Sequence, residues 1–463
     1  MIIFWGPLGA PGGGATAPHR LPVLGHLLSL RRDPLGFMAS LPAHGDLVRI
    51  GLGPVTAVVV CDPDLTQQML RQDRIFDKGG PQFDRGRELV GHGLATCPYA
   101  MHRRQRRLLQ PAFHADRITG YAPMMTYQIT EMVDSWRDGE VIDVKAQLHT
   151  LAAKVTAATL FGQAMPESDQ QRLLHDVEVV FAGVIRQAMM PERVRRWPVL
   201  GNRACLRAAE EARAILGELV AARRAEGVDH GDLCSALVMA RDNDGGQLSD
   251  GEIVDQVLTF FFAGTDTTAT ALAWALIQLD RHPEVAARLH AEVDAVLAGA
   301  AARHGDLPRL PFTGQVIAET LRLRPPAWLS TRTVTEDTEL GGHPLPAGST
   351  VIFSSYLIQH RPDLYPDPER FDPDRFDPAR PEPPRDAQLA FAAGARKCIG
   401  DRYALTEATL ALATIATRWR LRSLRGTDIR PTLAVVPEPR RLRMRATART
   451  PRSARAEEPG QLV

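Results

Sequence analysis

The chain has 463 residues, of which 44% are hydrophobic and 24% are charged, and its formal net charge is +1. This composition is typical of a soluble globular protein, and the near-neutral charge excludes a strongly basic nucleic-acid-binding protein. It gives no reason to expect an anionic membrane surface as the partner. The length accommodates one large domain or two to three ordinary ones.

The N-terminal residues 1–20 are rich in Gly, Pro and Ala, and we predict a disordered lead-in there. The apolar run at residues 1–5 is too short for a signal-peptide core or a membrane anchor. Five scattered cysteines without metal-knuckle spacing fit a reducing cytosol better than a disulfide framework. These features predict a cytoplasmic protein without a stable membrane anchor.

The next segments alternate between strand and helix patterns. Apolar residues alternate at 47–50 and 55–60 around a Gly/Pro turn, which predicts a hairpin. Residues 99–300 are mostly helical in pattern, and short β-type runs return at 331–353. The Pro/Asp-rich stretch 361–385 is predicted to be irregular coil.

The C-terminal part is predicted to hold one last helix at about 399–418, a short strand region, and a disordered tail at 446–463. The sequence contains no recognisable internal repeat, and no linker-like segment cleanly divides it into domains. We therefore predict a single mixed, mostly helical domain over residues 21–445.

One predicted helix is much longer than the others. Ser249 and Glu252 form a capping-box pattern ahead of an apolar run over residues 253–279. Asp255 and Asp266 interrupt this run, which favours a buried core helix over a membrane span. About thirty helical residues extend roughly 45 Å, enough to cross a domain.

A loop just before the last helix carries the strongest chemical signal: Phe391, Gly394, Arg396, Cys398 and Gly400 in the pattern F-x-x-G-x-R-x-C-x-G. Free N–H groups at a helix N-terminus stabilise a thiolate. The two glycines would let the backbone approach a flat ring, and the arginine can bind a carboxylate. A lone cysteine is otherwise most often a buried structural residue.

This pattern resembles the ligand loop of the cytochrome P450 family, and its chance occurrence in such a chain is roughly 10⁻⁴. The resemblance implies that Cys398 is the axial iron ligand of haem b, with Phe391 and Gly400 beside the cofactor. It also implies the family fold, a mostly α protein with small β-sheets (α+β). The haem would lie between the long central helix and the helix that follows the cysteine.

The long helix contains Ala263-Gly-Thr-Asp-Thr-Thr268, which resembles the family's oxygen-activation motif. Gly264 would leave room for a ligand on the iron, and the Thr267 hydroxyl can bond back to the Ala263 carbonyl. Asp266 could then supply protons to bound dioxygen. Such residues are common in core helices, so the motif gains weight from its position ahead of the cysteine loop.

Glu319 and Arg322 share a face of a helix that ends at Pro325-Pro326. An exposed ion pair is the usual fate of such a spacing. The resemblance implies instead a buried structural network completed by Arg370 of the sequence Pro-Glu-Arg-Phe. This network would hold the 361–385 coil behind the haem.

Four further residues match the family's haem-propionate contacts: His102, Arg106, Arg332 and Arg396. The run 102–107 could otherwise be a solvated basic face.

The remaining arginines of that run, Arg103, Arg104 and Arg107, could face an acidic iron–sulfur protein. No reductase sequence is present. The resemblance therefore implies that dioxygen is used with electrons from NAD(P)H, delivered by a separate ferredoxin and ferredoxin reductase.

Several framework stretches resemble the bacterial branch that oxidises cyclised terpene hydrocarbons, such as the pentalenene and epi-isozizaene oxygenases. They are residues 44–50, 102–113 and 321–328. The segments expected to line the pocket are 78–98, 180–200, 260–264 and 326–330. Three phenylalanines (Phe260, Phe261 and Phe262) and Trp328 are compatible with an apolar substrate, although aromatic residues in a core helix usually serve packing.

The sequence thus predicts a haem-thiolate monooxygenase acting on a mostly apolar secondary metabolite, with a terpenoid favoured. A polyketide or macrolide, or a fatty acid, is the alternative substrate. Two other classes stay open: a haem protein that binds or senses a ligand without turnover, and a peroxide-using or isomerase relative. The intact Asp266–Thr267 pair counts against both, because neither needs a proton relay.

Overall fold

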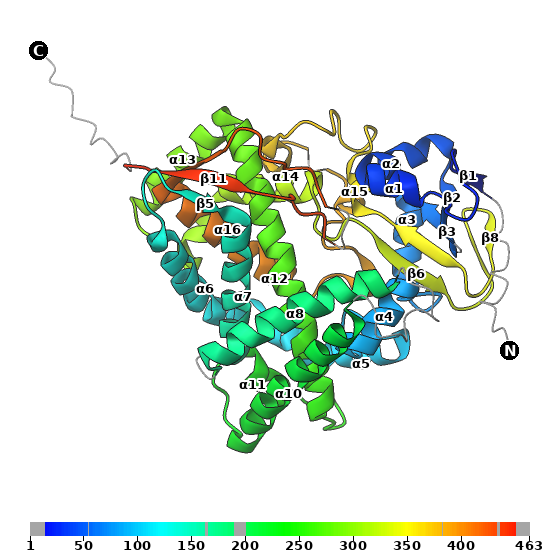
Figure 1. Ribbon diagram of the computed structural model, residues 1–463, viewed down its shortest axis with the longest axis horizontal. Helices are drawn as coiled ribbons and strands as arrows, with labels where there is room; N and C mark the ends of the chain where they lie inside the picture. Colours follow the sequence, from blue (N-terminus) through cyan, green and yellow to red (C-terminus); the bar gives the residue numbers. More distant parts are fainter. Residues whose placement is uncertain are drawn as a thin grey trace, which may run out of the picture.

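The computed structural model describes residues 14–53, 55–162, 165–188, 201–381, 383–432 and 436–450. Helices make up most of these residues, with the largest sheet to one side of them and the strands β5 and β11 toward the opposite side (Figure 1). The predicted pocket segment 180–200 lies partly outside the described residues. Of the predicted disordered ends, residues 1–13 and 451–463 lie outside them.

The predicted mostly helical stretch 99–300 and the predicted last helix are confirmed, and the structure adds helices at 27–90 and 355–359 that were not predicted. The described helices are α1 (Leu27–Arg32), α2 (Pro34–Ser40), α3 (Pro63–Arg71), α4 (Pro81–Val90), α5 (Tyr99–Leu109), α6 (Ala115–Ser135), α7 (Val144–Phe161), α8 (Glu167–Ala188), α10 (Asn202–Glu226), α11 (Leu233–Met239), α12 (Asp250–Arg281), α13 (Pro283–Leu297), α14 (Pro311–Leu323), α15 (Ser355–Gln359) and α16 (Asp401–Arg418).

The strands form three separate sheets. The largest has the order β1-β2-β3-β9-β6-β4, made of Ala15–Thr16, Leu47–Leu52, Val55–Val60, Thr350–Phe353, Ser330–Val334 and Phe76–Asp77. A three-stranded sheet joins β10 (Trp419–Ser423), β11 (Arg443–Ala448) and β5 (Val141–Asp143), and β7 (Thr338–Leu340) pairs with β8 (His343–Leu345). The predicted hairpin is confirmed as the antiparallel pair of β2 and β3.

Helix α12 runs through the middle of the helical part (Figure 1). Ser249 and Glu252 form the predicted capping box at its start. In the described part of the chain it is the one helix long and apolar enough to cross a membrane, but 72% of its most apolar window is buried inside the fold. It is therefore a core helix, as Asp255 and Asp266 within the apolar run led us to expect.

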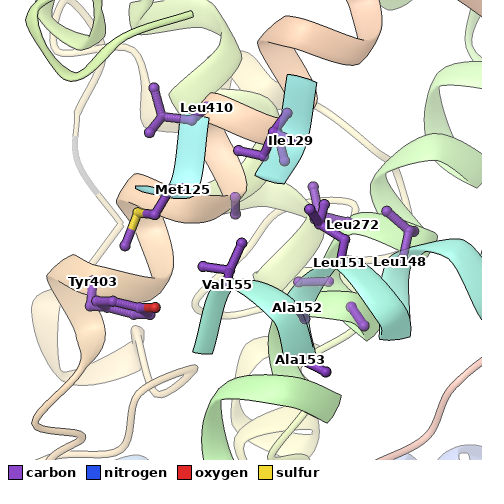
Figure 2. Close-up of a cluster of buried hydrophobic side chains, with 14 of the residues drawn as sticks. Met125, Ile129, Leu148, Leu151, Ala152, Ala153, Val155, Leu272, Tyr403 and Leu410 are labelled. Carbon is purple, nitrogen blue, oxygen red and sulfur yellow. The ribbon is translucent and has the colours of Figure 1, made fainter. Parts of the chain in front are cut away.

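The main core lies where α6, α7, α12 and α16 meet. Figure 2 shows apolar side chains from these four helices pointing toward one another, among them Met125, Leu151, Val155, Leu272 and Leu410. All five are at most 2% exposed. This packing fixes α7, α12 and α16 relative to one another, and these three helices carry most of the site described below.

Some residues that we predicted to be disordered at the two chain ends form strands. Residues 15–16, placed in the disordered lead-in, form β1 and pair in parallel with β2. Residues 446–448, placed in the disordered tail, belong to β11 and pair with β10. Local composition does not reveal these strands, because their hydrogen bonds come from partners distant in sequence.

The predicted three-residue network exists, but with a different arginine. Glu319 and Arg322 are buried and joined by two hydrogen bonds of 2.7 and 2.8 Å. The expectation for Arg370 is wrong, because its side chain is exposed and only its carbonyl accepts from Arg322. The arginine that approaches Glu319 is Arg375, with Nε 3.5 Å from Oε1, and the Asp372 amide donates to the same oxygen.

This arrangement predicts unequal effects of two similar substitutions. Arg375→Ala removes a charge partner from a buried carboxylate and is expected to lower the free energy of unfolding by about 3 kcal/mol. Arg370→Ala is expected to change it by less than about 0.5 kcal/mol. Urea unfolding of both variants measures the difference. Equal losses would contradict the assignment.

Candidate functional site

A cavity of about 360 Å³ lies between α12, the loop before α16, and parts of α5, α7 and α14. Its walls are mostly apolar, with side chains such as Leu94, Phe113, Leu160, Phe260, Ile317, Leu321 and Phe353. Of the predicted pocket segments, 78–98, 260–264 and 326–330 contribute to it. In the described part of 180–200 no residue lines it.

Only one of the four aromatic residues singled out in the sequence lines the cavity, and that is Phe260. Phe261 and Trp328 are buried in the hydrophobic core, and Phe262 packs against it. For these three residues the packing interpretation is the correct one.

Cys398 lies in the wall of this cavity, and its side chain is accessible from the cavity although protein surrounds it. Its amide donates to the Phe391 carbonyl at 2.9 Å, and α16 begins at Asp401 after the N-cap Gly400. Burial raises the pKa of the thiol, while the backbone N–H of Gly400 acts in the opposite direction. The helix start therefore favours the thiolate as expected, but does not overcome burial in the protein alone.

The two glycines of this loop have different roles. Gly394 has φ +70°, and a Cβ there would lie 2.2 Å from the Leu70 carbonyl oxygen, so contact with another protein segment excludes any side chain. At Gly400 a Cβ would meet only Phe113, at an ordinary 3.7 Å. Gly400 lines the cavity, so it is the one that leaves room for a bound ring.

The four basic residues expected to bind carboxylates all line the cavity: His102, Arg106, Arg332 and Arg396. They come from α5, β6 and the cysteine loop. Lys78, which sequence analysis did not select, lines it as well. Its ammonium donates to the Ala95 carbonyl at 2.8 Å. A signal was present, because Lys78 is one of only four lysines beside 51 arginines.

Positive charge accumulates at this wall without full compensation. Burial, with repulsion from Arg332 and Arg396, lowers the pKa of Lys78 to about 7. Burial and Arg396 likewise lower the pKa of Arg332 to about 10. Arg396 itself donates to Asp77 at 2.6 Å, but in the described residues Lys78 and Arg332 have no ion-pair partner within 4.0 Å. The wall therefore suits a ligand with carboxylates.

The remaining two residues of this group differ in charge and contacts. Burial, followed by repulsion from Arg396 and Lys78, lowers the pKa of His102 to about 3, so the ring is neutral. Its buried Nδ1 has no hydrogen-bond partner among the described residues. Arg106 donates to the Lys397 carbonyl at 2.5 Å, next to Cys398.

On α12, residues Ala263, Gly264, Thr267 and Thr268 line the cavity. The predicted bond from the Thr267 hydroxyl to the Ala263 carbonyl is confirmed at 2.5 Å. For Gly264 the structure gives an additional reason, since a Cβ there would lie 2.7 Å from Oγ1 of Thr156 on α7. The missing side chain therefore lets two helices approach, besides opening the cavity wall.

Asp266 is placed differently from our expectation. It does not line the cavity, and its Oδ1 lies 3.4 Å from Nδ1 of His149 on α7. The helical turn accounts for this, because neighbouring residues on a helix point about 100° apart. The structure brings Gly264 and Thr267 to Cys398 and leaves Asp266 on the outer side of α12.

The three arginines assigned to an electron-delivering partner divide into two groups. Arg104 contacts Glu252 at 3.0 Å and Asp242 at 3.5 Å, so it fastens α5 to the start of α12, and the expectation for it is wrong. Arg103 and Arg107 are exposed.

Comparisons with known proteins agree with this site. The family model described as Cytochrome P450 matches residues 16–442. The chain is 45% identical to the pentalenene oxygenase of Streptomyces avermitilis, covering 94% of this chain and 98% of that protein. It is 44% identical to the cyclooctat-9-en-7-ol 5-monooxygenase of Streptomyces melanosporofaciens, covering 90% and 92%.

A solved structure also matches over nearly the full length. The cytochrome P450DA heme domain superposes with a TM-score of 0.86 at 26% identity, covering 96% of this chain and 99% of that one.

Proposed function

The chain belongs to the cytochrome P450 family and is a monooxygenase of that family, and from this premise we propose that it oxidises a cyclised terpene hydrocarbon. The observation that carries the proposal is a mostly apolar cavity in which Cys398 and the Ala263–Thr268 turn of α12 meet. The names of the two Streptomyces relatives favour a terpenoid over a macrolide or a fatty acid.

The family implies haem b, and the residues present fit it. Cys398 would be the iron ligand, with Phe391 and Gly400 beside the ring. When bound, haem supplies the activation of dioxygen with two electrons. We assign the haem carboxylates to the positive wall formed by His102, Arg106, Arg332, Arg396 and Lys78. Among the described residues, two of its buried cations, Lys78 and Arg332, have no anionic partner.

The protein's own residues would then control protons and position the substrate. The hydroxyl of Thr267 faces the cavity and would hold a proton there, with Asp266 as its source on the other side of the same helix turn. The apolar side chains would bind the hydrocarbon and exclude water from the reacting carbon.

We propose that the electrons come from NAD(P)H through a separate ferredoxin and ferredoxin reductase. Arg103 and Arg107, both exposed on α5, would face the acidic partner. A cytoplasmic location, with no stable membrane anchor, stays part of the proposal.

The test is incubation of the haem-loaded enzyme with surrogate ferredoxin, reductase, NADPH and ¹⁸O₂. Cyclised terpene hydrocarbons, macrolides and fatty acids are offered separately. We expect ¹⁸O incorporation into a terpene product and no reaction when peroxide replaces the electron source. Oxidation of a macrolide or fatty acid alone would refute the terpenoid assignment. Efficient peroxide-driven turnover would refute the proton relay.

The position of Lys78 predicts that the affinity of the protein for haem depends on pH. Lys78→Met should speed haem loss roughly tenfold, as expected for a charge-assisted hydrogen bond. Because the pKa of Lys78 is about 7 without a bound anion, haem binding to the natural protein should take up a proton above pH 7. Its affinity should therefore fall as the pH rises above 7.

Haem transfer to apomyoglobin between pH 6 and 9 measures both effects. Lys154→Met, on the exposed side of α7, is the matched control. An unchanged rate and pH dependence in Lys78→Met would remove Lys78 from the cofactor contacts.

A further inference from the structure

Four partly exposed charged side chains form a row that ends at Asp266. His149 on α7 has Nδ1 3.4 Å from Asp266 Oδ1 and Nε2 2.9 Å from Glu438 Oε2. Glu438 lies between β10 and β11, and its other oxygen accepts from Lys145 at 2.5 Å. Three separate parts of the chain therefore meet at one imidazole ring.

The exposed fractions show that this row reaches solvent. The side chains of Lys145, Glu438, His149 and Asp266 are 27%, 21%, 23% and 26% exposed. Two positive and two negative groups alternate, so the row is balanced in charge when all four are ionised. Thr267, the next residue on α12, faces the cavity instead.

His149 is held in its charged form. Burial acts to lower its pKa, but hydrogen bonds to Asp266 and Glu438, together with their charges, raise the pKa to about 9. In the described residues, the charged groups that face the ring are these two, from α12 and from the segment before β11. Lys145 forms an ion pair with Glu438 on the far side of that carboxylate.

Helix α7 connects this row with the cavity. His149 and Thr156 are seven residues apart and so lie on the same helix face, roughly 10 Å from each other along the axis. At the inner end, Thr156 lines the cavity against Gly264, and its buried hydroxyl has no hydrogen-bond partner among the described residues. At the outer end, His149 contacts Asp266.

We propose that His149 is a positioning residue for proton delivery, which holds the Asp266 carboxylate on the outer side of α12. After Asp266 has given up a proton, His149 protonates it again with a proton that comes from solvent. The proposal rests on the proposed monooxygenase function. In the transfer, the Nδ1–H bond of the imidazolium breaks and an O–H bond forms on Asp266. The neutral imidazole keeps its Nε2–H bond to Glu438, and a proton from water restores its charge.

The expected pH dependence follows from this arrangement. His149 is fully charged below its ordinary pKa of 6.5 and loses its charge as the pH rises through about 9. The share of electrons that forms product should therefore drop through about pH 9, with a matching rise in hydrogen peroxide. The contribution of the ion pairs of His149 with Asp266 and Glu438 to the free energy of unfolding should be lost as the pH rises from 6.5 through about 9.

The test compares His149→Gln and Glu438→Gln with Lys154→Gln, which removes an exposed charge from the same helix. In His149→Gln we expect unchanged substrate-binding spectra, an approximately tenfold lower ratio of product to peroxide, and a larger solvent deuterium effect on turnover. The drop near pH 9 should disappear. Glu438→Gln should shift that drop to lower pH, and Lys154→Gln should match the natural enzyme.

A second measurement does not depend on turnover. NMR titration of ¹³C-labelled histidine in the diamagnetic ferrous–carbon monoxide form should give His149 a pKa near 9, and a lower one in Asp266→Asn. An ordinary pKa, or an unchanged product ratio and pH profile in His149→Gln, would overturn the role of His149. Absence of any oxidation by the natural enzyme would instead overturn the proposed function.

Discussion

Replacing Cys398 with serine is expected to abolish the red-shifted Soret band that the reduced, carbon-monoxide-treated protein gives with a sulfur ligand. Oxidation of substrate should fall by at least about 10³-fold, because a hydroxyl donates much less electron density to iron than a thiolate does. Cys398 is the one of the five cysteines that lines the cavity, so no other thiol replaces it. Difference spectra and product assays measure the two effects.

The matched control is Cys234→Ala, a fully buried cysteine on α11 that does not line the cavity. It should keep both the band and the activity. A Cys398→Ser protein that retains the sulfur-type band would show that another group binds the iron, and the assignment of the whole site would fail.

Thr267→Ala is expected to keep haem and substrate binding while reducing product formation roughly 10²-fold, the usual contribution of a positioned proton donor. Consumption of NAD(P)H should continue, with the electrons recovered as hydrogen peroxide. The reason is geometric, since Thr267 lines the cavity and directly follows Asp266 on α12.

Thr265→Ala is the control, because Thr265 also bonds back along α12, to Phe261, but is buried away from the cavity. Thr267→Ser keeps the hydroxyl and should restore most of the product. Tight coupling of NAD(P)H use to product in Thr267→Ala would remove this residue from the proton path.

Much of the site could be predicted because its signals are local. The cysteine loop and the Ala263–Thr268 turn each lie within ten residues, so short motifs were enough to select Cys398, Gly264 and Thr267, which line one cavity. The capping box at Ser249 likewise depends on contacts between neighbouring residues. The helix that crosses the core was therefore predictable from its own sequence.

The errors arose where tertiary packing decides between similar local patterns. The sequence contains Pro-Glu-Arg370-Phe and, five residues later, Pro-Asp-Arg375-Phe, and only the folded coil shows that Arg375 approaches Glu319. Lys78 belongs to no motif, and the rarity of lysine in this chain does not reveal that the fold brings Lys78, Arg332 and Arg396 together.

The proton-supplying role of Asp266 was predicted because Asp266 precedes Thr267. The direction of its side chain, however, depends on the contact with His149 of α7. The sequence distance between Asp266 and His149 gave no hint of their contact.

The close approach of Gly264 to Thr156 limits how the substrate range of this enzyme can be altered. A methyl group at position 264 would lie 2.7 Å from Oγ1 of Thr156, so the Thr156 side chain or α7 itself must move. Because His149 lies on the same face of α7 as Thr156, a movement of α7 would reach the surface and loosen the contact of His149 with Asp266. Redesign for bulkier or smaller hydrocarbons should therefore use wall positions such as Phe113, Ile317 and Leu321, where a change of volume leaves this helix pair in place.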